Sequence, residues 1–410
     1  MRHILATVLL GGLAAAAAAQ STETRPGRDT AGSEEAAEED ISQCEWYDAA
    51  SLPGIEVRDL AAAPGDALFL TGDAATAHGG AELVTLRSFD GGGTWEEVDR
   101  FVLPGGQDAG AHALEVDADG HLFVLGWSTI DGVPHALIRR SFAAGDPGTW
   151  ETSEATWPWA LLGALDSDGR GRVLLALGFA GPEGVGWRVL SSPRAVGSWR
   201  TDDLYQPELP GVTAAVPHDL EPADDGSVLL VGQLEGTPQR WVSRYLPGRW
   251  TALRGESREW TTVDLFELGS ASYGLAAAAA LPLRGGGAVV AGWGVGGGGA
   301  DDYAWITRRT GPAMGSWVTD AFQLVPGLSA FALDGEATVG GALLLLGVAQ
   351  HAEGWQLVLQ RSEDSGVGWQ EILVRGGIAN SWSGELTVVE GVGLFVAATA
   401  RGVTTVLACR

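Results

Sequence analysis

The stretch "SFDGGGTWEEV", Ser88 to Val98, places three consecutive glycines between an aspartate and a tryptophan. Glycines permit backbone conformations with positive φ, and an aspartate side chain can accept hydrogen bonds from the amides of a tight turn. A tryptophan directly after the turn supplies a large ring that can be buried between two sheets. The stretch therefore predicts a turn that leads into a β-strand.

Degenerate copies of this turn recur along the chain, each ending in a tryptophan. These residues are Trp46, Trp95, Trp150, Trp199, Trp250, Trp317 and Trp369. Seven apolar runs such as "ALFLTG" and "LFVLGW" recur in phase with them, each preceding its tryptophan except the last run, near the C-terminus. Two markers in phase predict one unit of about 50 residues that is repeated seven times.

Each unit is predicted to contain four short strands. In the unit that ends at Trp150, we expect strands at residues 112–117, 122–127, 136–141 and 149–154. Strands of about six residues joined by turns form an antiparallel sheet, and several such sheets packed radially cover one another's faces. The predicted fold class is all-β, a seven-bladed β-propeller with four antiparallel strands per blade.

The opening stretch also resembles a known repeat. It matches the S-x-D-x-G-x-T-W pattern of the Asp-box, or BNR repeat, of the sialidase-like β-propellers of secreted bacterial proteins, at Ser88, Asp90, Gly92, Thr94 and Trp95. A second copy that lacks only the threonine contains Ser362, Asp364, Gly366 and Trp369. The resemblance implies that the box is structural and lies on the turn between the third and fourth strands, away from the ligand-binding face.

The N-terminal residues predict export. Residues 1–19 combine a basic start, an apolar run and a small-residue end, which is the pattern of a cleaved signal peptide. Residues 20–41 are polar and acidic and are expected to be a disordered linker, so the propeller is assigned to residues 42–410. We expect a secreted or periplasmic monomer with no membrane span after cleavage.

Net charge limits the partners. The formal charge of −27 repels a phosphate backbone and excludes nucleic acid as an expected ligand. We expect a glycan or an extracellular protein as the partner, and no cofactor.

Ring closure involves the two cysteines. The last unit supplies three strands, and the segment around Trp46 is expected to be the fourth strand of that blade. This pairing brings Cys44 beside Cys409 and predicts a disulfide, consistent with export. The alternative is a pair of free thiols.

Two histidines occupy matching positions in their units. His112 and His218 each precede the glycine of an Asp-Gly turn by eight residues, and both are expected on the ligand-binding side. They could ligate a metal, but the sequence contains no closely spaced ligand pair. The alternative is that they are tolerated polar residues.

The acidic turns at Asp117 and Asp166 resemble the start of calcium loops, but hairpin turns explain them better.

Aromatic and acidic residues are also predicted in loops of the ligand-binding side. They are Trp159, Tyr205, Trp260, Tyr273, Trp382, Asp301 and Asp302. Flat rings can stack on sugars or accept a peptide. The alternative for several of them is packing between blades.

The sequence leaves two functions open. The first is a secreted propeller that binds a ligand without catalysis. The second is a sialidase-like or other glycoside hydrolase, with Arg258, Glu267 and Tyr273 as candidate catalytic residues in one ligand-side loop. The early arginine motif of the sialidase family is absent.

Overall fold

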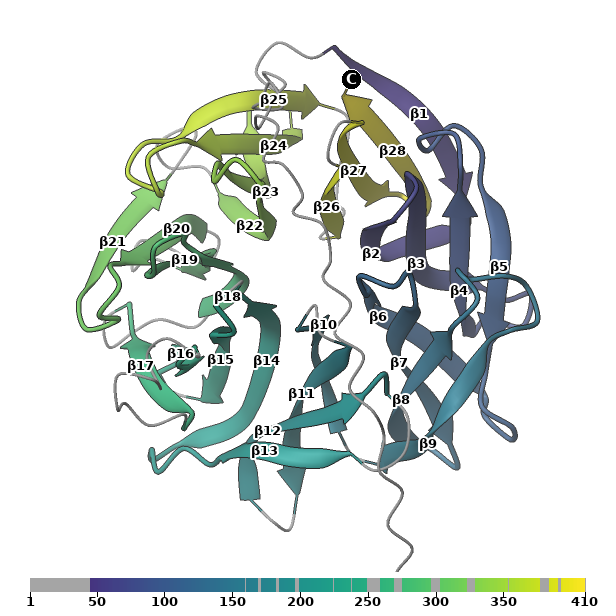
Figure 1. Cartoon of the computed structure of the whole chain (residues 1–410), viewed down its shortest axis with the longest axis horizontal. Coiled ribbons are helices and arrows are strands. Elements are labelled where there is room, and N and C mark those ends of the chain that lie inside the picture. Colours follow the sequence, from purple (N-terminus) through teal and green to yellow (C-terminus); the bar gives the residue numbers. More distant parts are fainter. Residues whose placement is uncertain are drawn as a thin grey trace, which may run out of the picture. The chain divides into compact units, whose positions relative to one another are not determined.

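Seven four-stranded antiparallel sheets form a ring, which confirms the predicted β-propeller (Figure 1). The computed structural model describes residues 45–158, 160–168, 171–181, 184–195, 199–223, 225–236, 238–248, 259–268, 275–295, 303–322, 329–352, 354–376, 383–389 and 392–409. The predicted signal peptide and linker lie outside these residues. In the described part of the chain, no helix is long and apolar enough to cross a membrane.

From the axis outwards, the strands of blades 1 to 6 follow chain order, and in blade 7 the N-terminal strand is the outermost one. The innermost strands are β2 (Ile55–Ala63), β6 (Asp108–Val116), β10 (Ala160–Ser167), β14 (Val212–Pro222), β18 (Leu275–Pro282), β22 (Ala330–Ala337) and β26 (Gly384–Val389). The second strands are β3 (Ala67–Ala75), β7 (Leu122–Ile130), β11 (Arg172–Gly181), β15 (Val228–Gly236), β19 (Ala288–Val295), β23 (Leu343–His351) and β27 (Gly393–Ala400).

The remaining strands form the outer half of each blade. The third strands are β4 (Ala81–Ser88), β8 (Val133–Ser141), β12 (Gly184–Pro193), β16 (Arg240–Leu246), β20 (Tyr303–Thr310), β24 (Gly354–Ser362) and β28 (Val403–Cys409). The outermost strands are β5 (Glu96–Phe101), β9 (Glu151–Pro158), β13 (Arg200–Tyr205), β17 (Thr261–Phe266), β21 (Trp317–Phe322), β25 (Gln370–Gly376) and, for blade 7, β1 (Trp46–Pro53).

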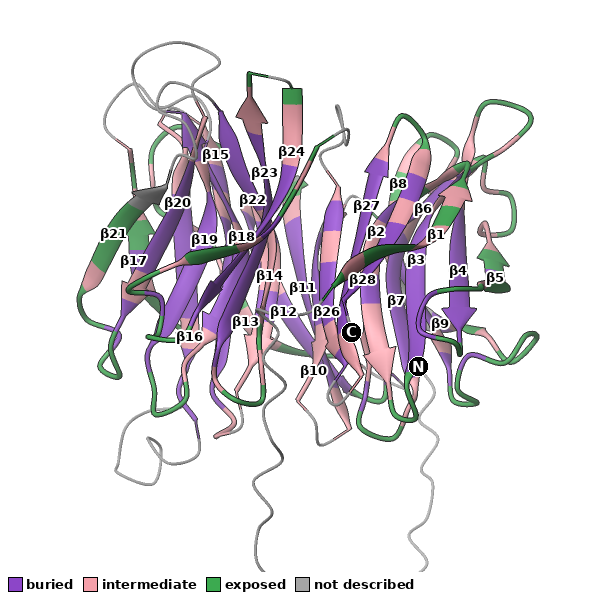
Figure 2. Ribbon diagram, turned by 90° about the horizontal axis from the view of Figure 1, so that it is seen from above, coloured by how far each residue is buried: buried purple, intermediate pink, exposed green. Residues whose placement is uncertain are grey.

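The hydrophobic core lies in the seams between blades. Each cluster of buried side chains draws on two neighbouring sheets, and Figure 2 shows the buried residues concentrated along the inner strands. Three tryptophans of third strands, Trp187, Trp241 and Trp305, are fully buried. Burying a ring of this size between sheets is a main source of stability in such a stack.

The opening stretch forms the predicted turn between β4 and β5. The Asp90 carboxylate accepts hydrogen bonds from the Thr94 amide at 2.8 Å and the Ser88 hydroxyl at 2.9 Å. Gly92 has a φ of 83°, and the Trp95 Nε1–H donates to its carbonyl at 2.8 Å. Hydrogen bonds from Thr94 and Ser88 lower the pKa of Asp90 to about 2. These contacts give the stretch a structural role.

Its second copy folds in the same way between β24 and β25. The Ser362 hydroxyl donates to Asp364 at 2.9 Å, and the Gly368 amide donates to the same carboxylate oxygen at 2.7 Å. Trp369 packs against the core shared by blades 5 and 6.

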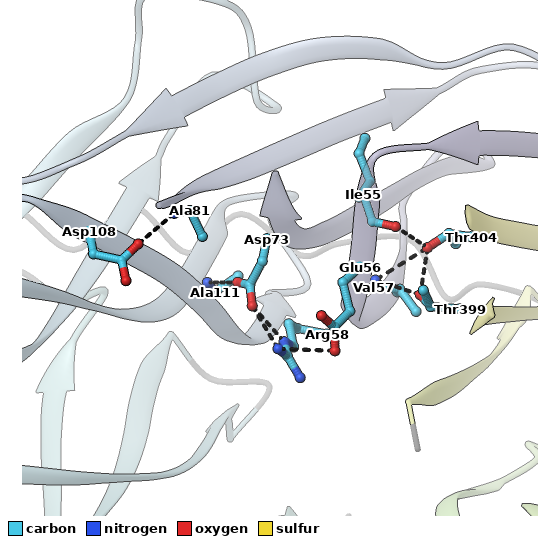
Figure 3. A network of polar contacts seen from close by, with 10 residues as sticks. All are labelled: Ile55, Glu56, Val57, Arg58, Asp73, Ala81, Asp108, Ala111, Thr399 and Thr404. Carbon is cyan, nitrogen blue, oxygen red and sulfur yellow. Dashed lines mark hydrogen bonds and ion pairs between the residues drawn. The ribbon is translucent and has the colours of Figure 1, made fainter. Parts of the chain in front are cut away.

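The N-terminal strand closes the ring as predicted. β1 pairs with β28 in a register that places Trp46 opposite Cys409. Hydroxyl groups then join blade 7 to blade 1: the Val57 amide donates to Thr399 Oγ1 at 2.9 Å, and Thr404 Oγ1 donates to the Ile55 carbonyl at 2.7 Å (Figure 3). Cys44 lies outside the described residues, so its bond to Cys409 stays a prediction.

We predict that intact protein shows no alkylated cysteine until a reductant is added, as measured by mass spectrometry. The variant Cys44→Ala should lose up to about 5 kcal/mol of unfolding free energy, because the bond closes a loop that spans nearly the whole propeller. Alkylation of both thiols in unreduced protein would contradict the predicted pairing.

Glycines of the second strands shape the axis. Gly72, Gly126, Gly232, Gly292 and Gly347 occupy equivalent positions, each at the end of the apolar run of its repeat. A Cβ atom at these positions would lie 2.1–2.7 Å from a carbonyl oxygen of the innermost strand. In each case the innermost strand carries a β-bulge beside the glycine.

Blade 7 supports the link between glycine and bulge. Its second strand carries Ala398 at the equivalent position, and β26 pairs with β27 without a register shift. At these five bulges the carbonyl of the innermost strand lies so close to the second strand that a residue without Cβ fits best below it.

We predict that Gly292→Ala lowers the free energy of unfolding by at least about 2 kcal/mol, since its Cβ would lie 2.1 Å from the Ala276 carbonyl oxygen. The matched control is Gly311→Ala, where a Cβ meets nothing within 4 Å. Denaturant titration of both variants measures the difference, and equal stabilities would refute the packing argument.

Candidate functional site

The bulges aim three polar side chains at the central axis. The extra residue of the bulge is Arg58 in β2, His112 in β6 and His218 in β14. The two histidines therefore occupy equivalent positions, as the sequence predicted, but they lie within innermost strands and not in loops. A strand that starts at Asp108, four residues earlier than expected, accounts for the difference at His112.

Burial keeps both imidazoles neutral. It lowers the pKa of His112 to about 4, with further contributions from the positive charges that His218 and Arg58 can carry. Burial also lowers the pKa of His218 to about 4, although a hydrogen bond with Gln233 opposes the shift. His218 Nε2 is shielded from solvent and has no hydrogen-bond partner among the described residues.

Acidic side chains occupy two levels of the innermost strands, after the bulge in those strands that have one. The first level contains Asp59, Asp219, Asp334 and Glu385, and the second, two residues further along each strand, contains Glu115, Asp166, Glu221 and Glu336. All eight residues are half-buried. We call this set the axial carboxyls.

The axial carboxyls bond to neighbouring blades. Asp59 accepts a hydrogen bond from the Leu114 amide at 2.6 Å, and Asp219 accepts one from the Ala280 amide at 2.7 Å. Glu115 accepts a hydrogen bond from the Ser167 hydroxyl at 2.6 Å. Each of these contacts crosses from one innermost strand to the next.

Burial raises the pKa values of the axial carboxyls. The pKa is about 7 for Asp59, about 6 for Asp219, and about 8 for Glu115, Asp334 and Glu336. Repulsion between the carboxylates adds to burial, for example between Asp334 and Glu336. The pKa values of Asp166, Glu221 and Glu385 also lie well above their ordinary range for the same two reasons.

Among the described innermost strands, only β2 contains an arginine, Arg58. Its Nη2 lies 2.7 Å from Asp73 Oδ2 and 3.2 Å from Glu56 Oε1 (Figure 3). Asp73 also accepts a hydrogen bond from the Ala111 amide at 2.9 Å, which fixes the pair to blade 2. Because Arg58 is already paired, the axis keeps an excess of acidic groups.

One side of the axis is apolar. β18, with the sequence "LAAAAALP", carries no polar side chain, and the bulge residue of β22 is Leu333. The half-buried rings of Trp293 and Tyr303 pack against the same hydrophobic cluster as Leu333, and their ring centroids are 5.5 Å apart. The site therefore combines small and aromatic side chains from blades 5 and 6 with polar groups from the other blades.

Two grooves open on the face of the propeller opposite the predicted ligand-binding loops. On this face the first strand of each blade turns into the second, and the third turns into the fourth. A groove of about 370 Å³ between blades 3 and 4 is lined by Asp168, Arg172, Arg200, Asp202 and Trp260. A larger one of about 1040 Å³ across blades 4 to 6 is lined by four prolines and reaches Glu221.

The structure corrects the prediction for Trp260. This residue directly precedes β17, so it lies on the face opposite the predicted ligand-binding loops. The long segment between β16 and β17 caused the error, because it contains both Trp250 and Trp260, and Trp260 directly precedes the strand. Trp250 lies outside the described residues.

The candidate catalytic loop is also divided by β17. Residues 251–258, which include Arg258, come before this strand, whereas Glu267 and Tyr273 follow it. Glu267 accepts a hydrogen bond from Arg240 at 3.1 Å. A strand therefore interrupts the sequence segment that was expected to be one loop. Arg258 and Tyr273 themselves lie outside the described residues.

The other predicted ligand contacts have mixed outcomes. Tyr205 packs on Trp187 with ring centroids 5.4 Å apart, and the Arg244 guanidinium lies 4.5 Å from its ring centre. It is therefore a seam residue, which was the alternative interpretation. Trp159, Trp382, Asp301 and Asp302 lie outside the described residues.

Sequence reasoning missed the axial carboxyls as a group. Their signal is an acidic residue within an otherwise apolar first strand, as in "HALEVD" and "VPHDLEP".

The acidic turn at Asp117 does bring Asp117, Asp119 and His121 within 4.8 Å of one another. However, Asp117 is bonded to the amides of its own turn, and Asp119 pairs with Arg194, as expected of a hairpin turn.

Comparisons with known proteins define the fold. No family model matches the chain, and no curated protein matches it in sequence. An ulvan lyase of polysaccharide lyase family 25 is similar in structure, with a TM-score of 0.56 and 11% identity over 88% of this chain and 95% of that chain. An α-L-arabinanase of Penicillium chrysogenum has a TM-score of 0.49 and 12% identity, covering 89% of this chain and 98% of its own. These likenesses concern the propeller fold alone, and the Asp-box family assignment is not confirmed.

Proposed function

We propose that this protein is an exported β-propeller that binds a neutral glycan at its central axis. The observation that carries the proposal is the pairing, at one axis, of polar groups from blades 1, 2, 3, 4, 6 and 7 with the apolar side of blades 5 and 6. The export signal predicted at residues 1–19 supports a site of action outside the cytoplasm, where we propose that the protein is a monomer.

The chemistry of the axis suits sugar hydroxyls. A protonated carboxyl donates and accepts hydrogen bonds, and a carboxylate accepts them strongly. Carboxyls with pKa values of about 6 to 8, such as Asp219 and Glu115, supply both forms at neutral pH. Trp293, Tyr303 and Leu333 offer surfaces against which the C–H face of a sugar ring can pack.

The charge of the axis selects against anionic ligands. Eight carboxyls face the axis, and the guanidinium of Arg58 is already paired with Asp73 and Glu56. Sialic acid recognition needs a cluster of arginines around a carboxylate, and the described innermost strands contain only Arg58. The ulvan lyase was solved with -[GlcA(1-4)Rha3S]-, which bears acidic groups, so its ligand is a poor candidate here.

We predict that a neutral glycan is bound on an array and that Glu385→Gln weakens this binding about tenfold, since losing one hydrogen bond at a buried polar group costs about 1.4 kcal/mol. The matched control is Glu371→Gln, at an exposed position of the outermost strand β25. Affinities can be measured by calorimetry. Equal losses in both variants, or a preference for anionic glycans, would reject the axial site.

Glycoside hydrolysis is the second candidate. Such enzymes use one carboxylic acid with a raised pKa and one carboxylate, and the axis supplies several carboxyls whose pKa values differ. In that case one axial carboxyl protonates the leaving oxygen, and a second acts on water or on the sugar.

A panel of fluorogenic neutral glycosides separates the two functions. If the protein only binds, we expect no turnover with any member of the panel, together with saturable binding. Turnover that falls at least 100-fold in Glu115→Gln or Glu336→Gln, but not in Glu371→Gln, would replace the binding function by hydrolysis.

A further inference from the structure

The seam between blades 6 and 7 depends on carboxyl groups more than any other seam among the described innermost strands. Asp334 Oδ2 accepts a hydrogen bond from the Leu386 amide at 2.7 Å, and Glu336 Oε2 accepts one from the Val388 amide at 2.9 Å. Both carboxyls belong to β22, and both amides belong to β26. Glu385, which directly precedes Leu386 in sequence, is a third carboxyl near the seam, because its charge interacts with that of Asp334.

The charged groups near this seam do not balance the three carboxyls. From other innermost strands, Asp59, Asp219 and Glu221 add repulsion. Arg58 attracts Glu385 but is paired with Asp73 and Glu56. β18, β19 and β27 contain no titratable side chain, and β23 contains only His351 at its end. In β20, Tyr303 packs against aromatic rings, Arg308 pairs with Asp264 and Arg309 pairs with Asp320.

The neighbouring seam between blades 7 and 1 offers an internal comparison. There the Val57 amide donates to the hydroxyl of Thr399, and Thr399 and Thr404 bond to each other at 2.6 Å (Figure 3). Hydroxyl groups do not ionise in the physiological pH range. Two adjacent seams of one ring thus differ in the acceptor that receives the amide, a carboxyl in one and a hydroxyl in the other.

We propose that protons on Asp334 and Glu336 hold the seam between blades 6 and 7 closed, and that this seam loosens more than the hydroxyl-bonded seam between blades 7 and 1 as the pH rises. A protonated carboxyl still accepts the amide hydrogen bond through its carbonyl oxygen and carries no charge. Loss of both protons places two negative charges two residues apart on β22, next to Glu385. A carboxylate accepts an amide hydrogen bond more strongly than a carboxyl does, so the seam loosens because repulsion of Asp334 and Glu336 from the other axial carboxyls outweighs that gain.

The direction of the pH effect follows from linkage. The pKa values of Asp334 and Glu336 are raised to about 8, so the folded state binds more protons than the unfolded chain. Their stabilising effect is therefore complete at acidic pH, below the pKa of the unfolded chain, and is lost as the pH rises through 8. His112 and His218, with pKa values of about 4, remain neutral from pH 6.5 to 9 and do not contribute in this window.

Hydrogen–deuterium exchange of the full chain at pH 6.5 and pH 9 tests the proposal, after correction for the intrinsic pH dependence of exchange. We expect the protection of the Leu386 and Val388 amides to fall at least about tenfold, while that of Val57 stays within about twofold. An equal change at all three amides, or none, would overturn the proposal with wild-type protein alone.

A double variant isolates the carboxyls. Asp334→Asn with Glu336→Gln keeps an acceptor oxygen at both positions but cannot ionise, so Leu386 and Val388 should keep their protection at pH 9. Glu371→Gln is the control and should behave as the wild type. If the double variant does not fold, Glu336→Gln alone should preserve the protection of Val388. Wild-type pH dependence in the folded variant would overturn the proposal.

Discussion

The close approach of the second strand to the bulged first strand is the constraint on which the axis depends. A glycine such as Gly232 or Gly292 leaves room for the carbonyl of the innermost strand, and that strand can then carry an extra residue. The extra residue turns toward the axis and shifts the register of the residues after it. The bulge therefore determines the position of His112 and His218 and, one or three residues later, of most of the axial carboxyls.

The seams of the ring are held by different chemistry at different radii. At large radius, Arg139, Arg244 and Arg308 of third strands each pair at 2.7 Å with an aspartate of the preceding blade's outermost strand. These pairs are largely buried, so each guanidinium needs its partner to remain where it is. At small radius, carboxyls and hydroxyls accept backbone amides from the next blade. The outer contacts provide charge balance, whereas the inner contacts leave an excess of negative charge at the axis.

Repetition made the fold predictable from the sequence. Seven turns and seven apolar runs in phase defined the blades, and the three-strand last unit predicted that the N-terminal strand around Trp46 closes the ring. The position of Trp260 was wrong because one blade has a long segment before its outermost strand, and a count of tryptophans cannot tell which of two leads into that strand. Local extensions break a repeat without changing its architecture.

The axial site was harder to predict, because its members are far apart in sequence and only the ring brings them together. Glu115 and Glu221 share a position in their repeats, but an acidic residue in one strand is ordinarily a solvated residue. The bulge is equally hard to predict from the sequence, because its signal is only a glycine at the end of an apolar run. Once Gly72 or Gly347 is recognised as a packing requirement, the residue that follows its partner on the innermost strand becomes a candidate axial residue.

The central claim is that the bulges aim His112 and His218 into a shielded axis where a neutral glycan binds. Nuclear magnetic resonance of the imidazole carbons, assigned with His112→Gln and His218→Gln, tests it most directly. The account predicts that both rings titrate near pH 4 and that their resonances shift when the glycan is added. Titration near the ordinary histidine value of about 6.5, with no shift on addition of the bound glycan, would contradict it.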